Sequence, residues 1–291
     1  MNIIETPQKG KRLVTTVHQS RLPLCLPILK SNKQATGVRK IVTHWGSIEI
    51  DGIFTQRHRD ILDAIMAVSK RRVVVDGAMR ILFDPREVLT FIGSTTGKAW
   101  LKQTIKEMQK IGSETIINGK LNGKSVVWEI SAGLIRDLSV AKTLAPRRTG
   151  TCTLIDGAEA RDETHMWVVN LSQGLTRLFE EDMGMLMSKQ TASMICRLKT
   201  GEGKALARFL LSHQRAHHIG WASAAAAIGV VPPSDSTDAK GKRRIRMAVV
   251  AIKTDETGLS ELGIAIDSDG AHYMRASEIS FLTPEARKQL R

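Results

Sequence analysis

Residues 91–110 read FIGSTTGKAWLKQTIKEMQK, a glycine-containing turn followed by a lysine-rich helical pattern. A phosphate-binding P-loop has the form G-x-x-x-x-G-K-[ST] and follows a buried strand. Here only Ser-Thr-Thr separates Gly93 from Gly97, Ala99 follows Lys98, and the preceding residues have a helical pattern. GEGKAL at residues 201–206 departs from the motif in the same ways. Neither stretch predicts a nucleotide site.

The residues after this turn predict an amphipathic helix. Its apolar positions recur at helical spacing and are expected to pack inward: Leu101, Ile105 and Met108. Its basic positions recur every fourth residue and form a stripe on another face: Lys98, Lys102 and Lys106. We expect Gly93 to permit the tight turn and the hydroxyls of residues 94–96 to cap the helix.

Other predicted elements precede and follow this helix in a regular order. Residues 38–52 indicate two strands, and residues 55–70 a helix with Thr55 as N-cap. A hairpin around Asp76–Gly77 follows, then a short helix with Asp84 as cap and Pro85 in its first turn. After the basic helix, residues 114–131 predict two strands around a Gly- and Asn-rich turn.

A second unit has the same order. A strand at 164–170 precedes helices at 171–182, 188–198 and 201–215. A short helix at 221–230, a basic helix at 238–253 and two strands joined at Asp269–Gly270 complete it. The sequence therefore predicts an α+β protein with two tandem winged helix-turn-helix domains. We expect a basic flexible arm over residues 1–37, a first domain over 38–150 and a second over 151–291, divided within the weakly periodic residues 141–163.

The charge of the chain favours a polyanionic partner. Lys and Arg number 43 against 29 Asp and Glu, a net charge of +14 with a pI near 10.0. Aromatic residues make up only 4 %, too few for stacking on single strands, so duplex DNA is favoured. The apolar stretch at residues 22–29 is too short for a membrane span and contains two prolines, which argues against a membrane partner.

The second basic helix repeats the pattern of the first. Ile245, Val249 and Ile252 are expected to face inward, which places Lys240, Arg243 and Arg244 outward. Such helices suit insertion into the major groove, where Arg reads guanine and Lys mostly meets phosphate. Lys120 and Lys124 would flank the DNA backbone from the first wing, whereas the second wing, Asp269–His272, is not basic. A merely solvated basic face explains two such helices less well.

Other chemistry is not predicted. His213, His217, His218 and Cys196 have no zinc-like spacing, so we expect no metal and read these histidines as helix-end caps. Adjacent histidines with Tyr273 do not form the His-hydrophobic-His and tyrosine set of a DNA-nicking relaxase. Cys25, Cys152 and Cys196 indicate reduced thiols. We therefore expect no catalysis and no cofactor.

Three segments resemble the plasmid replication initiators of the Rep type, with the nearest likeness to the IncQ-type RepC and TrfA-like initiators. They are GSIEIDGIFTQRHRDILDAIMA (46–67), THMWVVNLSQGLTRLFEE (164–181) and GKALARFLLSHQRAHHIGWASAAAAIGV (203–230). The resemblance implies a bacterial cytoplasmic protein that binds tandem repeats (iterons) in origin duplex DNA, helps to open the origin and attracts the replicative helicase or host initiator. It also implies homodimers that repress their own promoter.

By the same resemblance, DNA contact falls on the two basic helices, here on Lys98, Lys102, Lys106, Lys240, Lys242, Arg243, Arg244 and Arg246. The region between the domains, residues 141–163, departs from the pattern, and residues 146–163 resemble an insertion. Two other functions stay open. A winged-helix transcriptional repressor or autoregulator would use the same helices on a palindrome, whereas an initiator spans direct repeats. An ATP-driven replication enzyme is disfavoured by the absence of a P-loop.

Overall fold

The computed structural model describes residues 2–3, 10–29, 38–43, 46–111, 114–121, 124–131, 133–140, 152–153, 159–160, 166–232, 234, 237–274 and 279–289. The first half contains β1 (Asn2–Ile3), β2 (Lys11–Thr16), α1 (Val17–Arg21), β3 (Val38–Thr43), β4 (Gly46–Asp51), α2 (Gln56–Val68), β5 (Arg71–Val75), β6 (Ala78–Phe83), α3 (Pro85–Phe91), α4 (Lys98–Lys110), β7 (Glu114–Leu121), β8 (Lys124–Ser131) and β9 (Ile135–Val140).

The second half contains β10 (Cys152–Thr153), β11 (Glu159–Ala160), β12 (Trp167–Leu171), α5 (Gln173–Glu181), β13 (Gly184–Ser188), α6 (Lys189–Arg197), α7 (Gly201–Leu211), β14 (His217–Gly220), α8 (Trp221–Ala227), α9 (Ala239–Lys253), α10 (Glu256–Glu261), β15 (Ile264–Ile266), β16 (Gly270–Tyr273), β17 (Ser280–Leu282) and α11 (Pro284–Gln289). The protein is α+β, as the sequence predicts.

Local signals placed several elements correctly. Thr55 is the N-cap of α2 in a capping box with His58. The β5–β6 hairpin turns at Asp76 and Gly77, which both have positive φ, as a two-residue I′ turn requires. Asp84 caps α3 by accepting a hydrogen bond from Arg86 N at 2.7 Å, and Pro85 occupies the first turn. These residues define the start of α2, the turn between β5 and β6, and the start of α3, which precede α4 in the chain.

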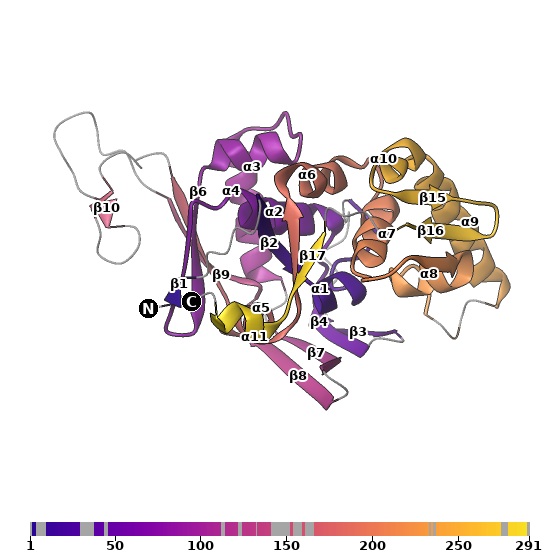
Figure 1. Cartoon of the computed structure of the whole chain (residues 1–291), viewed down its shortest axis with the longest axis horizontal. Helices are drawn as coiled ribbons and strands as arrows, with labels where there is room; N and C mark the ends of the chain where they lie inside the picture. Colours follow the sequence, from indigo (N-terminus) through magenta and orange to yellow (C-terminus); the bar gives the residue numbers. More distant parts are fainter. Residues whose placement is uncertain are drawn as a thin grey trace.

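The described residues form five sheets, three of which connect distant parts of the chain. β1-β5-β6-β12-β9 is the largest, and β3-β4-β7-β8 contains the ribbon that follows α4. The sheet β17-β13-β2 joins strands from both ends of the chain, while β14-β16-β15 and β10-β11 are local. Figure 1 shows α7, α8, α9, α10, β15 and β16 together at one end of the molecule, beside the elements of the first half.

The expectation of a flexible arm over residues 1–37 is wrong for residues 10–29. β2 pairs antiparallel with β13, and Leu22 and Leu24 are buried. The basic residues at the start of β2 are also engaged, because Lys11 donates to Ser280 Oγ at 3.2 Å and Arg12 to the carbonyl of Ser69 at 2.5 Å. The prediction was wrong because it rested on the basic composition of this segment, whereas the apolar side chains of the segment belong to the core.

The expected division at residues 150/151 does not separate two sheets. β12 follows that point in the sequence, yet it pairs antiparallel with both β6 and β9. α5 packs on β8 and β6, and one core cluster runs from Leu13 to Leu282. Where the chain divides into separately folding domains therefore stays a prediction.

Candidate nucleic-acid interface

The second helix-turn-helix unit has the architecture of a winged helix. α7, α8 and α9 pack together, and β14, β15 and β16 form an antiparallel sheet in which β16 is central. In the order α7, β14, α8, α9, α10, β15, β16, helix α9 follows α7 and α8 and takes the position of a recognition helix. β15 and β16 form the wing beside it (Figure 1).

α9 is anchored along one narrow face. Asp238 caps it through a hydrogen bond from the backbone N–H of Gly241 to its carboxylate. Gly241, Ala248 and Ile252 are buried, whereas Ile245 and Val249, expected to face inward, are only half-buried. Two of these three buried residues are small, and most of the other side chains of α9 are exposed to solvent.

The outward surface of α9 is basic, as predicted, and also apolar. All five predicted side chains are exposed: Lys240, Lys242, Arg243, Arg244 and Arg246. Within the described residues none of the five forms an ion pair. Met247 and Val250 are 63 % and 66 % exposed and lie one turn after Arg243 and Arg246. Arginines can read guanine edges, and apolar side chains can contact thymine methyls.

α4 presents the first basic surface. Leu101, Ile105 and Met108 are fully buried, which confirms their predicted inward orientation. On the outer side Lys102 and Lys106 are exposed, and Lys98 is half-buried at the first turn. α4 packs on α2 and α3, and Arg57 of α2 lies over the Trp100 ring at 5.1 Å from its centroid.

The predicted hydroxyl cap of α4 is wrong. Gly97 is the N-cap, and because glycine has no side chain it provides no side-chain cap hydrogen bond; the hydroxyls of residues 94–96 precede the cap position. Instead Ser94 Oγ lies 2.6 Å from Thr96 Oγ1 and accepts from Thr96 N at 3.2 Å. Gly93 does provide the turn, with φ of +65°.

The two wings differ. In the first unit the β7–β8 ribbon pairs with β4 rather than with the β5–β6 hairpin, so it extends a separate sheet. Lys120 and Lys124 lie at the end of the ribbon next to its turn, where they pair with Ser125 and Leu121. The structure describes their backbone but not their side chains. The second wing carries Asp267 and Asp269 at its turn, which gives it acidic character.

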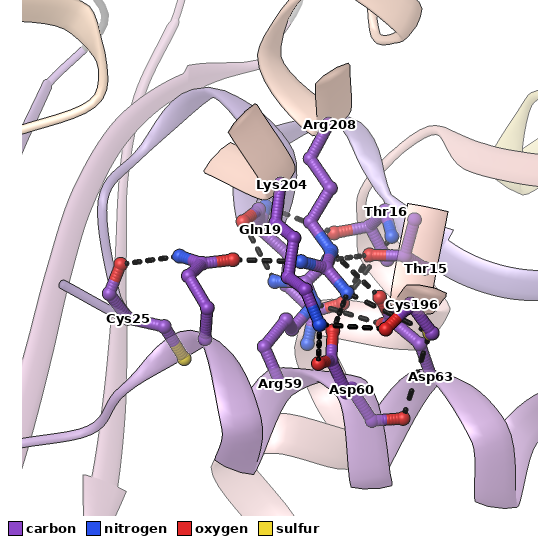
Figure 2. A network of polar contacts seen from close by, with 11 residues as sticks. Thr15, Thr16, Gln19, Cys25, Arg59, Asp60, Asp63, Cys196, Lys204 and Arg208 are labelled. Carbon is purple, nitrogen blue, oxygen red and sulfur yellow. Dashed lines mark hydrogen bonds and ion pairs between the residues drawn. The ribbon is translucent and has the colours of Figure 1, made fainter. Parts of the chain in front are cut away.

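A buried charge network joins α2 of the first unit to α7 of the second. Figure 2 shows Arg59, Asp60 and Asp63 on one helix with Lys204 and Arg208 reaching them from the other. Each of these five residues is only 2–5 % exposed. Arg208 bridges the two carboxylates, with Nη2 at 2.7 Å from Asp60 Oδ1 and Nε at 2.9 Å from Asp63 Oδ2. Lys204 also pairs with Asp60.

Three cations face two carboxylates in this network, and oxygens of uncharged groups complete it. Arg59 donates to Asp63 at 2.8 Å and to the carbonyl of Gln19 at 2.8 Å. Lys204 donates to the carbonyl of Cys196 at 2.6 Å, and Arg208 Nη1 donates to Gln56 Oε1 at 2.7 Å. Burial acts to lower the pKa of Arg208, but Asp63 and Asp60 outweigh it and raise that pKa.

This network is a buried contact between the two units, beside the core cluster that both share. Each of its two helices is the first of a helix-turn-helix unit, and α2 packs on α4 as α7 packs on α9. The residues of this network were not predicted as a site from the sequence. A signal was present in the i, i+4 spacing of Lys204 and Arg208 within the otherwise apolar helix GEGKALARFLL.

Comparison with protein-family models and with curated proteins gives no match. One solved structure is similar. It is described as the crystal structure of selenomethionine derivatives of domain 2 and domain 3 of RctB. The two sequences are 11 % identical, and the superposition has a TM-score of 0.49. It covers 87 % of the present chain and 89 % of the RctB chain. A likeness at this level supports no conclusion about activity. Among the described helices, none is long and apolar enough to cross a bilayer.

The histidines considered for metal binding do not form one group, and the expectation that all three cap a helix end is wrong for His217 and His218, which lie in β14. His213 lies at the end of α7 with Nδ1 at 2.9 Å from the carbonyl of Phe209, which confirms its reading as a helix-end cap. His217 stacks on His213, with ring centroids 4.4 Å apart. His218 is directed to the other face of β14, where it meets His272. Cys196 is buried beside Asp60 and Arg208.

Proposed function

We propose that the protein is a plasmid replication initiator that binds duplex DNA through α4 and α9, one helix from each helix-turn-helix unit. The observation that carries the proposal is the outer face of α9, where five basic side chains and two apolar ones are exposed on a helix in the recognition position. A second exposed basic helix, α4, lies in the same chain, and the α2–α7 network holds the two units together.

The finer parts of the proposal rest on the sequence resemblance. These are the binding of iterons, opening of the origin, recruitment of a helicase or host initiator, a homodimer that represses its own promoter, a bacterial cytoplasmic location, the absence of catalysis, and kinship with IncQ-type or TrfA-like initiators. A chain with two DNA-reading helices suits a long asymmetric site, because each unit can occupy one part of a direct repeat.

Selection from random duplex DNA at near-physiological salt, followed by footprinting, tests the proposal. We expect one asymmetric site of about two helical turns, bound by a single chain. An enriched palindrome bound by two chains would favour the repressor instead. If no sequence is enriched, the basic charge provides only non-specific affinity and the proposed function is wrong.

Arg243→Ala and Met247→Ala test direct base reading by α9. We expect each to lose roughly 1–3 kcal/mol on the selected DNA and much less on scrambled DNA, because base contacts carry the specificity. Lys189→Ala on α6 is the matched control for loss of an exposed cation and should leave the selectivity unchanged. Equal losses on selected and scrambled DNA would show that α9 contacts only the backbone.

Lys102→Ala tests backbone contact by α4. The exposed ammonium group is expected to neutralise one phosphate, so its removal should weaken all DNA similarly. The slope of log K against log salt should become shallower by about 0.9. Fluorescence anisotropy with selected and scrambled duplexes over a salt series measures both effects. An unchanged slope would place Lys102 away from the DNA.

A further inference from the structure

The second wing contains a cluster of metal-binding groups that the DNA-binding proposal does not use. His218 of β14 is the cross-strand partner of His272 of β16, and Asp269 lies in the turn just before β16. One ligand atom from each of these three residues lies within 4.8 Å of the others. They are distant in sequence, and the antiparallel register brings them together.

The contacts within the cluster bring nitrogen and oxygen donors to one point. His218 Nε2 lies 3.6 Å from Asp269 Oδ2, and the two imidazole centroids are 4.2 Å apart. His272 Nε2 lies 2.7 Å from Asp267 Oδ2, a carboxylate of the kind that orients metal-bound histidines. The two histidine side chains are 44 % and 43 % exposed, so an ion can enter from solvent.

The backbone around the cluster is held in place. Asp267 N donates to the carbonyl of Gly270 at 2.9 Å, which closes the turn. Trp221 donates twice to the same turn, from its backbone N–H to Asp269 O at 3.2 Å and from Nε1 to Ser268 O at 3.1 Å. A Cβ at Gly270 would lie 2.2 Å from the carbonyl oxygen of Ile219, so β14 and β16 approach closely there. Ligands on a fixed turn lose little freedom when they bind.

We propose that His218, Asp269 and His272 bind one divalent transition-metal ion of the zinc class. Two imidazoles and one carboxylate are a usual zinc donor set, and a borderline-soft cation prefers them to Mg²⁺ or Ca²⁺, which take oxygen ligands. Water completes the coordination, since the cluster lies on the surface.

The site changes the charge of the wing, and this part of the inference rests on the proposed function. Asp267 and Asp269 give the turn two negative charges where a wing meets DNA phosphates. A bound divalent cation offsets both. Metal binding should therefore strengthen DNA binding by removing repulsion at the wing.

Calorimetric titration of the full chain, stripped with a chelator and measured without DNA, tests the site itself. We expect saturable binding of one Zn²⁺, weakened about tenfold or more in His272→Ala and in Asp269→Asn. His217→Ala is the matched control, because this neighbouring histidine stacks on His213 instead. Co²⁺ should give a visible d–d spectrum that the first two variants lose. Equal Zn²⁺ affinity in all four proteins, or no saturable binding, overturns the site.

Titration of DNA with and without Zn²⁺ then tests the coupling. Tighter binding with Zn²⁺ in the wild-type chain, absent in His272→Ala, supports charge compensation at the wing. Zn²⁺ binding without any change in DNA affinity overturns the coupling and leaves the site established. Because the calorimetry uses no DNA, failure of the proposed function would not alter its result.

Discussion

Asp60→Asn is expected to lower the free energy of unfolding by about 3–5 kcal/mol, the usual cost of breaking a buried ion pair from one side. Asp60 holds both Lys204 and Arg208, and all three side chains are buried. Removing its charge leaves three buried cations facing one carboxylate, and water cannot reach them to compensate. Urea unfolding followed by circular dichroism measures the change.

Two variants define how this loss should be interpreted. Glu49→Gln removes a carboxylate from the surface pair Lys40–Glu49, so we expect less than about 1 kcal/mol. Adding Lys204→Met to Asp60→Asn restores the original excess of one cation and should recover part of the loss. A cost for Asp60→Asn as small as that of the surface variant would show that the network does not hold α2 to α7.

Stability should also fall steeply between pH 6.5 and pH 4. Burial, assisted by Arg57, lowers the pKa of His58 to about 4. Burial, assisted by Arg21 and His217, lowers the pKa of His213 to about 4 as well. His58 is neutral for a structural reason, since its Nδ1 accepts the backbone N–H of Thr55 at 3.1 Å in the capping box of α2.

Whether stability rises or falls with pH depends on whether the folded or the unfolded state binds more protons. Above pH 6.5 both histidines are neutral in the folded and unfolded states, so they do not affect the pH dependence. As the pH falls from 6.5 towards 4, the unfolded chain binds protons that the folded chain excludes, and the folded state loses stability. At about 1.4 kcal/mol per pKa unit, His58 accounts for about 3 kcal/mol by pH 4, and His213 adds a contribution of the same sign.

His58→Gln separates this effect from the titration of carboxylates. Glutamine at the same position can accept the Thr55 N–H and does not titrate, so the helix cap should survive. Between pH 6 and pH 5 the free energy of unfolding should fall with pH in both proteins. We expect the fall to be smaller in the variant by about 1 kcal/mol per pH unit. Identical slopes in urea unfolding series of the two proteins would show that His58 is protonated in the folded state.

Local patterns predicted the individual helices and turns well. The Asp76–Gly77 turn, the Asp84 cap and the inward face of α4 each depend on residues close in sequence. The exposure of the basic residues on α9 followed from the same periodicity. The prediction was less accurate where small residues made the contact, because Gly241 and Ala248 carry little hydrophobic signal yet lie where α9 meets its neighbours.

Long-range pairing was not predictable in this way. No local feature of β12 indicates that it lies between β6 and β9, and β2 belonged by composition to a basic arm. The cluster of His218 with His272 depends on strand register across a helix and a loop, so spacing alone grouped His218 with the wrong partners. Contacts of this kind are set by tertiary packing, which single-residue preferences do not encode.

The β17-β13-β2 sheet also determines when β2 can pair during synthesis of the chain. β2 leaves the ribosome early, but its only partner strand, within the described residues, is residues 184–188, and β6 likewise waits for β12. At 5–20 residues per second, the edge of β2 stays open for roughly 8–34 s and the edge of β6 for roughly 4–17 s. Unpaired strand edges promote aggregation between chains. We therefore expect this protein to depend on chaperones that bind the unfolded chain during translation. A fragment that stops at residue 150 would keep both edges open for its whole lifetime.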